Sequence, residues 1–248
     1  MGLRIVKTTK RAARQLVRDH QQGATVVEAA IVLPLLFTLL FGVIEVGGML
    51  KANSSAANAV RAGGRMASVE GNSGFADQSI MLRMTQEAAG FDKNEIEYVV
   101  IWHATGAGDA VPSGCKVANP LAPNTSSVGI YDGGKTVDAL GACNVYIRPA
   151  AAGGAFDMAN GKLAQPATYY FGCSGPSDPT ASHKVDCNWS PSNRRTLSTK
   201  AGVTPVKPPD YVGVYLQAKH SYYTRLFGKT ITVTDSAISL IEPQGYDP

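Results

Sequence analysis

Residues Ala24–Leu50, ATVVEAAIVLPLLFTLLFGVIEVGGML, form an apolar run in which only Glu28 and Glu45 are charged. As an α-helix rising about 1.5 Å per residue, this run would be about 40 Å long, enough to cross a hydrocarbon core about 30 Å thick. The uncharged part between the two glutamates is only 16 residues long, so at least one carboxylate must lie near a membrane interface. The composition therefore predicts a transmembrane helix over residues 24–50.

The residues before this run form a short basic leader. Residues 1–22 hold six lysines and arginines against one acid, Asp19, whereas the whole chain has a net charge of only +4. A cationic flank of this kind stays in the cytoplasm, so the residues after about 50 are expected on the other side of the membrane. A cleaved secretory signal has the same order of basic and apolar regions. Here the apolar run is long, starts late and lacks a clear A-x-A-like cleavage site, so we predict a single-pass inner-membrane protein with a cytoplasmic N-terminus and an extracytoplasmic C-terminal domain.

The rest of the chain carries no signature of a nucleic-acid-binding protein or of an enzyme. The leader contributes a net charge of +5, so the remaining residues sum to −1, whereas a nucleic-acid surface needs basic residues clustered within a folded domain. The four histidines are scattered, and the sequence contains no H-E-x-x-H, G-x-S-x-G or P-loop motif. We therefore expect no nucleic-acid partner, no enzymatic activity, no cofactor and no metal.

Four cysteines follow the apolar run: Cys115, Cys143, Cys173 and Cys187. An even number of cysteines in an exported region predicts disulfides, and no pair has the C-x-x-C spacing of a zinc or thioredoxin-like site. Four cysteines allow three connectivities. We favour Cys115–Cys143 with Cys173–Cys187, because each of these pairs closes a short local loop.

Helical and strand-like patterns alternate with long irregular stretches after residue 50. An alanine-rich helix is expected to continue over residues 51–69 and to break at Glu70–Gly74, before a second helix over 75–89. Strand-like runs occur at 96–103, 143–147, 211–220 and 229–241. The last two runs alternate apolar and polar residues, which predicts an antiparallel hairpin. The aromatic pair Tyr222-Tyr223 follows the first of them, and such pairs are more often buried anchors than ligand contacts.

These patterns predict an α+β protein, with a long N-terminal transmembrane α-helix followed by an antiparallel β-sheet domain that has long disulfide-linked loops. Loops as long as 104–136 and 149–210 are uncommon in compact domains unless they are functional or cross-linked. The expected organisation is a basic cytoplasmic leader over 1–23, a transmembrane helix over 24–50, its extramembrane extension over 51–69 and an extracytoplasmic α+β domain over 70–248.

The sharpest short signal is Gly23-Ala-Thr-Val-Val-Glu28, where a glycine closes the basic leader and a glutamate follows five residues later. A carboxylate near the end of a membrane helix is costly and points to a function. The Glu28 carboxylate could accept a hydrogen bond from the free α-amino group of a neighbouring subunit that is cut after Gly23. This contact would fix the axial register of packed helices. It could equally extend its carboxylate to the cytoplasmic interface. The residues alone favour neither interpretation.

Two further residues of the apolar run have structural consequences. Pro34 lies inside the helix, where it removes one backbone hydrogen bond and clashes with the preceding turn, so we expect a kink. Neighbouring helices in a membrane can tolerate such a kink. Glu45 could pair with a basic residue of a partner, but a position at the outer membrane boundary is the simpler interpretation.

The string GATVVEAAIVLPLLFTLLFGVIEVGGML, followed by NAVRAGGRMAS, closely resembles TadE-like proteins, the minor pseudopilins of tight-adherence (Tad) pilus systems. Its opening G-x-x-x-x-E is similar to the prepilin-peptidase motif of type IV pilins. The matching positions are Gly23, Val27, Glu28, Pro34, Gly42, Glu45, Gly47, Arg61, Gly63, Gly64 and Arg65. The resemblance covers residues 23–69 well, and it covers 211–243, which ends in Glu242-Pro243, weakly.

The resemblance implies that a prepilin peptidase cuts the chain between Gly23 and Ala24. The product would be a minor pilin that takes part in assembling or capping a type IV-like pilus for adhesion. Its partners would be the peptidase, other pilins or pseudopilins, the pilus assembly platform and membrane lipid, and the chain could become part of the pilus. The alternative is an uncut, membrane-anchored extracytoplasmic binding or adhesion module that uses residues 70–210 for recognition.

Overall fold

A computed structural model of the chain describes residues 6–91, 95–116, 139–147, 189–196, 208–225 and 228–242. The chain divides at Gly48 and Met49 into two compact units. We call residues 25–48 the apolar segment and the unit from Met49 onward the sheet unit.

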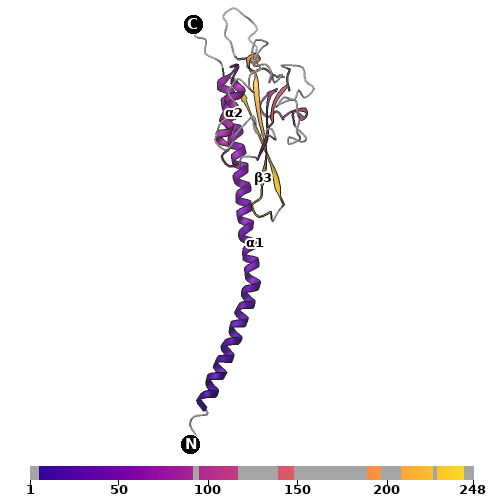
Figure 1. Ribbon diagram of the computed structural model, residues 1–248. Helices are drawn as coiled ribbons and strands as arrows, with labels where there is room; N and C mark the ends of the chain where they lie inside the picture. The colour runs from indigo at the N-terminus through magenta and orange to yellow at the C-terminus, as the bar shows by residue number, and fades with distance from the viewer. Residues whose placement is uncertain are drawn as a thin grey trace, which may run out of the picture. The chain divides into compact units, whose positions relative to one another are not determined.

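One helix, α1, runs from Val6 to Glu70 and passes through both units (Figure 1). It joins the two helical segments predicted at 24–50 and 51–69, and it also includes most of the basic leader, which the sequence did not indicate. The helix ends at the predicted break, where Gly71 adopts a positive φ of 56° that glycine tolerates best. The second helix, α2, spans Ala76–Glu87, within the predicted range 75–89.

The sheet has four antiparallel strands: β1 (Ile96–Ala104), β2 (Cys143–Ile147), β3 (Tyr211–Ser221) and β4 (Thr230–Leu240). Their order across the sheet is β2-β1-β3-β4. The predicted hairpin of the last two strands is confirmed, with Tyr211 opposite Leu240 and Ser221 opposite Thr230. The α+β fold predicted from the sequence is therefore confirmed.

Residues 49–70 of α1, called the outer part of α1 below, and α2 cover one face of the sheet. The α1 residues in this core are small, with Ala52, Ala56, Ala59 and Ala67 all fully buried. At Gly63 a Cβ atom would come within 2.6 Å of Met84 Cγ on α2. The small residues therefore allow close contact between α1 and its neighbours, and burial of the apolar strand residues they cover drives folding.

The other face of the sheet holds a second cluster, centred on Tyr98, Val100 and Trp102 of β1. Trp102 pairs across the strands with Gly213 of β3, and a Cβ at Gly213 would lie only 2.2–2.4 Å from atoms of the indole ring. Gly213 thus provides the space in which the tryptophan ring lies.

A disulfide joins Cys115 to Cys143 with a Cα–Cα distance of 6.2 Å, which confirms that predicted pairing. It connects the short 3-10 turn Ser113–Cys115 to the first residue of β2, so it secures the connection between β1 and β2. The predicted Cys173–Cys187 pair lies outside the described residues, as does most of both long loops.

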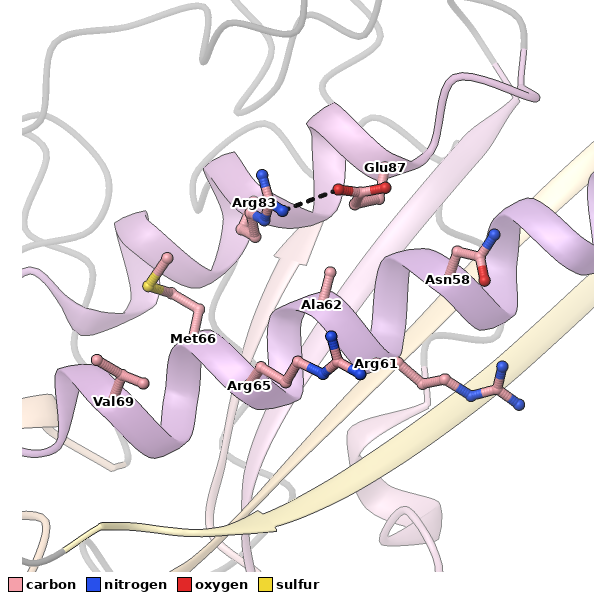
Figure 2. A pocket seen from close by; sticks show the side chains of 8 residues that line it. All are labelled: Asn58, Arg61, Ala62, Arg65, Met66, Val69, Arg83 and Glu87. Atoms are coloured by element: carbon pink, nitrogen blue, oxygen red, sulfur yellow. Dashed lines mark ion pairs between the residues drawn. The ribbon is translucent and has the colours of Figure 1, made fainter.

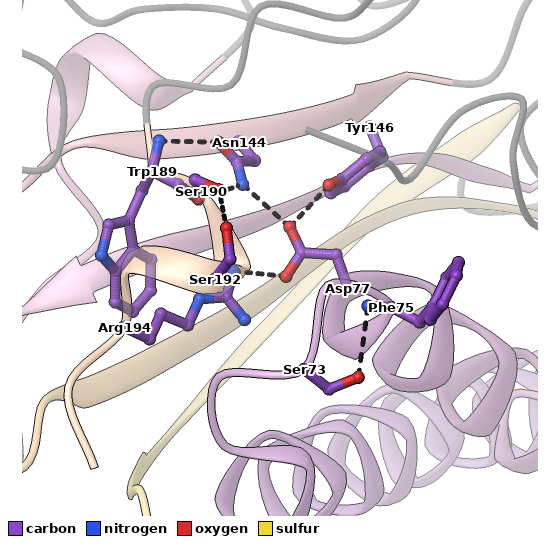
Figure 3. A network of polar contacts seen from close by, with 9 residues as sticks. All are labelled: Ser73, Phe75, Asp77, Asn144, Tyr146, Trp189, Ser190, Ser192 and Arg194. Atoms are coloured by element: carbon purple, nitrogen blue, oxygen red, sulfur yellow. Dashed lines mark hydrogen bonds and ion pairs between the residues drawn. The ribbon is translucent and has the colours of Figure 1, made fainter. Parts of the chain in front are cut away.

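A buried polar network attaches α2 to β2 and to the segment 189–196 (Figure 3). Asp77 of α2 accepts hydrogen bonds from Asn144 Nδ2 at 2.8 Å and from the Tyr146 hydroxyl at 2.6 Å, and it forms an ion pair with Arg194. Burial and the negative charge of Asp77 raise the pKa of Tyr146 well above its usual value, so the phenol remains a donor. The guanidinium of Arg194 also lies over the Trp189 ring, 4.3 Å from its centroid.

A second buried carboxylate, Asp210, lies just before β3. It receives hydrogen bonds from the backbone N–H of Arg195 at 2.8 Å and from Arg195 Nε at 2.7 Å, and His103 Nε2 lies 3.2 Å away. Burial acts to raise the pKa of Asp210, but the hydrogen bonds from His103 and Arg195 outweigh it and hold the pKa at about 2. Asp210 is therefore an ionised anchor that fastens the 189–196 segment to the start of β3.

Substitution of Gly213 tests the packing of Trp102. We expect Gly213→Ala to lower the free energy of unfolding by about 1–3 kcal/mol, because the new methyl group overlaps the indole ring. Chemical denaturation in detergent, followed by tryptophan fluorescence, measures this directly, since both tryptophans are buried in the sheet unit. Gly106→Ala is the matched control, because a Cβ there meets no atom within 4 Å; equal effects of the two variants would contradict the prediction.

Substitution of Asp77 tests the buried network. Asp77→Asn keeps the shape of the side chain but leaves the Arg194 cation buried without its counter-ion, so we expect a loss of about 3–5 kcal/mol in the same unfolding measurement. The double variant Asp77→Asn with Arg194→Met removes both charges and should recover much of the loss. An Asp77→Asn protein as stable as the parent would show that the ion pair is not needed.

Candidate functional site

The large apolar side chains of the apolar segment are exposed. Those between Val26 and Val46 are 40–71% exposed. An 18-residue stretch of this helix has a mean hydropathy of 2.4. A helix that is hydrophobic all round needs lipid or other helices around it. It is the one described helix that is long and apolar enough to cross a membrane, and it fits a single-pass membrane protein.

One polar group inside this segment, the Thr38 hydroxyl, bonds within its own helix. The Thr38 hydroxyl donates to the carbonyl of Pro34 at 2.8 Å, so it costs little in an apolar surrounding. Phe37 and Phe41 stack one turn apart with a centroid distance of 6.1 Å. Pro34 lies within α1, and the helix continues on both sides of it. The kink expected at Pro34 stays a prediction.

The two glutamates of the run differ in environment. Glu28 is exposed on the helix surface, five residues after Gly23, and both Gly23 and Ala24 lie within α1. Glu45 is fully buried, with 0% of its surface exposed. A buried carboxylate is held by partners, a property that the sequence pattern did not indicate, whereas the carboxylate of Glu28 is accessible to a partner or to an interface.

Arginines line a hollow between α1 and α2 in the sheet unit (Figure 2). The hollow has a volume of about 480 Å³ and is lined by Asn58, Arg61, Ala62, Arg65, Met66, Val69, Arg83 and Glu87. Arg83 pairs with Glu87 at 3.0 Å, but within the described part of the chain neither Arg61 nor Arg65 has an acidic partner. Two like charges one helical turn apart repel each other, so the hollow suits a carboxylate from outside the chain.

The remaining predicted residues are only partly described. The backbone N–H of Glu242 donates to the carbonyl of Ser68 at 3.0 Å, and the Ser68 hydroxyl donates to the carbonyl of Leu240 at 2.6 Å. The end of β4 is thereby fastened to the last turn of α1, a role of Ser68 that no sequence motif indicated. Pro243, Cys173 and Cys187 lie outside the described residues.

The buried charged groups form contacts that hold the fold together. His103 stacks on Trp189 at 4.7 Å between ring centroids and faces Asp210, so its ring is enclosed by packing. In the described part of the chain, no group of three His, Cys, Asp or Glu side chains is placed to hold a metal ion. The expectation that the chain is not an enzyme stays a prediction.

Comparison with known proteins adds a family for the N-terminal part. No curated protein sequence and no solved structure matches the chain. A family model described as "TadE-like protein" matches residues 23–65. The matched range starts at Gly23, contains both glutamates of the apolar run and Pro34, and ends at Arg65 in the arginine-lined hollow. Residues 23–65 therefore match the TadE-like family, as the resemblance in the sequence predicted.

Proposed function

We propose that this protein is a minor pseudopilin of a Tad-type pilus, cut by a prepilin peptidase after Gly23 and acting in assembly or capping of the filament. The observation that carries the proposal is the apolar segment. Its large apolar side chains are exposed, it follows a basic leader, and it bears one exposed carboxylate near its start. Such a segment can first lie in lipid and later pack among other helices of the same kind, because both surroundings are apolar.

Charge and redox chemistry support the same orientation of the chain in the membrane. The six basic residues of the leader favour the cytoplasm for the N-terminus. The Cys115–Cys143 disulfide lies in the sheet unit, and disulfides persist outside the cytoplasm. Both features support an extracytoplasmic sheet unit, with the leader on the side where the expected peptidase and assembly platform would meet it.

Glu28 would act as a register residue. Cleavage after Gly23 leaves a free amine on Ala24, and in a helix Glu28 lies about 6 Å along the axis from that residue. If the amine of one subunit pairs with Glu28 of the next, both charges are neutralised away from water and the helices are staggered by about this distance. An unpaired amine and carboxylate in the same apolar environment would be costly.

Processing is tested by the mass of the N-terminal peptide from membranes, with and without a co-expressed prepilin peptidase. We expect a chain that starts at Ala24 only when the peptidase is present, and we expect Gly23→Leu to abolish the cut because it enlarges the residue at the cleaved bond. Gly42→Leu is the matched control, since a Cβ at Gly42 meets no atom within 4 Å. A chain that starts at Met1 in all cases would favour the uncut anchored module.

The role of Glu28 is tested separately from processing. Glu28→Gln removes the charge and keeps the shape, so we expect normal processing but an about tenfold or larger loss of co-purification with the major pilin, since buried charge pairs at interfaces are worth this much or more. Glu70→Gln, at the other end of α1, is the control and should leave co-purification unchanged. Unchanged assembly of the Glu28→Gln protein would mean that the carboxylate only extends to the membrane surface.

A further inference from the structure

The turn between β3 and β4 has an unusual surface. Tyr223 is 63% exposed, and Lys219, Arg225 and Lys229 are exposed as well. No acid occurs between Lys219 and Asp235 in the sequence, so every charged residue of the turn is basic. The expectation that Tyr222-Tyr223 would be a buried anchor is therefore wrong for Tyr223, because it lies beyond the last paired residues, Ser221 and Thr230.

Contacts within the sheet unit show at which end of that unit the turn lies. β4 ends beside Ser68 of α1, and Ser239 lies against Gly64. From Ser239 back to Thr230 the strand covers about 30 Å, whereas α1 covers only about 20 Å from Gly64 back to Lys51. Since the two elements lie side by side in the core (Figure 1), the turn reaches at least the level of Lys51, where the chain enters from the apolar segment.

A second chain of contacts places the turn at the same end. Gly90 packs against Ser55 and the carbonyl of Lys51, and Glu95 follows five residues later. Glu95 accepts a hydrogen bond from the backbone N–H of Ser221 at 2.7 Å, and its own carbonyl accepts one from Lys219 at 2.6 Å. The hydrogen bonds to Glu95 therefore place the base of the turn towards the Lys51 end of the unit.

The backbone gives no reason for a cation at the tip. Arg225 has a positive φ of 61°, a conformation that glycine or asparagine adopts at lower cost. A side chain kept at a strained position points to a role for the side chain itself.

We propose that the β3–β4 turn contacts the surface of the membrane that holds the apolar segment, with Tyr223 at the headgroup level and Arg225 and Lys229 bound to anionic lipid headgroups. The inference rests on the membrane-spanning role of α1 in the proposed function, but it does not depend on processing at Gly23. Tyrosine is favoured at membrane interfaces because its ring is amphipathic. Each basic residue close to an anionic surface strengthens the contact by about fivefold, and salt weakens it.

The test uses the full, uncut chain in lipid nanodiscs, with the photo-reactive residue benzoylphenylalanine in place of Tyr223. The matched control carries the same residue in place of Phe75, which is 53% exposed and lies beyond the opposite end of the outer part of α1. We expect lipid adducts at position 223 and only background at position 75. The yield at 223 should fall about fivefold or more when phosphatidylglycerol is omitted from phosphatidylcholine discs, or in the Arg225→Glu and Lys229→Glu double variant.

Equal adduct yields at the two positions would overturn the proposal. A yield at 223 that responds neither to phosphatidylglycerol nor to charge reversal would overturn the part played by the anionic headgroup. The Cys115–Cys143 disulfide, read from mobility without reductant, verifies that each variant is folded. The nanodisc samples contain no peptidase, so they do not test processing. If the chain is cut normally in cells but gives no lipid adduct at position 223, the contact of the turn with the membrane is rejected and the proposed processing is not.

Discussion

Close packing of the outer part of α1 against the sheet is the contact on which the sheet unit depends. It is possible because Ala52, Ala56, Ala59, Gly63 and Ala67 present almost no side chain to their neighbours. A larger residue on this side of the helix would push α1 away from β3 and open the core. In the segment before Met49 the same helix carries large, exposed apolar side chains. One continuous helix is therefore adapted to two different surroundings, and the change in side-chain size marks the transition.

Local patterns of the sequence predicted the elements that depend on local chemistry. The alternation in 211–220 and 229–241 predicted the hairpin because its two strands are adjacent in the chain and share one turn. Cys115 and Cys143 were paired correctly because they close a short loop. The break after Glu70 followed from its glycines and polar residues, whose backbone preferences act without help from the rest of the fold.

The rest depends on contacts between residues far apart in the chain. Nothing near Asp77 in the sequence shows that Asn144 and Arg194 will surround it, since these partners lie 67 and 117 residues away. Gly213 looks like a weak point in a strand until the ring of Trp102 is placed on it. The burial of Glu45 was missed as well, because its position in an apolar run indicates only the cost of its charge. At the candidate site, sequence reasoning identified Glu28, Arg61 and Arg65, but the hollow forms only once α2 brings Arg83 and Glu87 beside α1.

The attachment of β4 to α1 has a mechanical consequence. Leu240 and Glu242 are bonded to Ser68, and Ser239 lies against Gly64, so strand and helix run in the same direction along their contact. Tension applied along α1 from its N-terminal end therefore acts parallel to this contact and loads it in shear. Contacts loaded in shear must break together, whereas contacts that are peeled apart break one after another. The geometry thus makes the sheet unit resist being pulled off the helix that carries it.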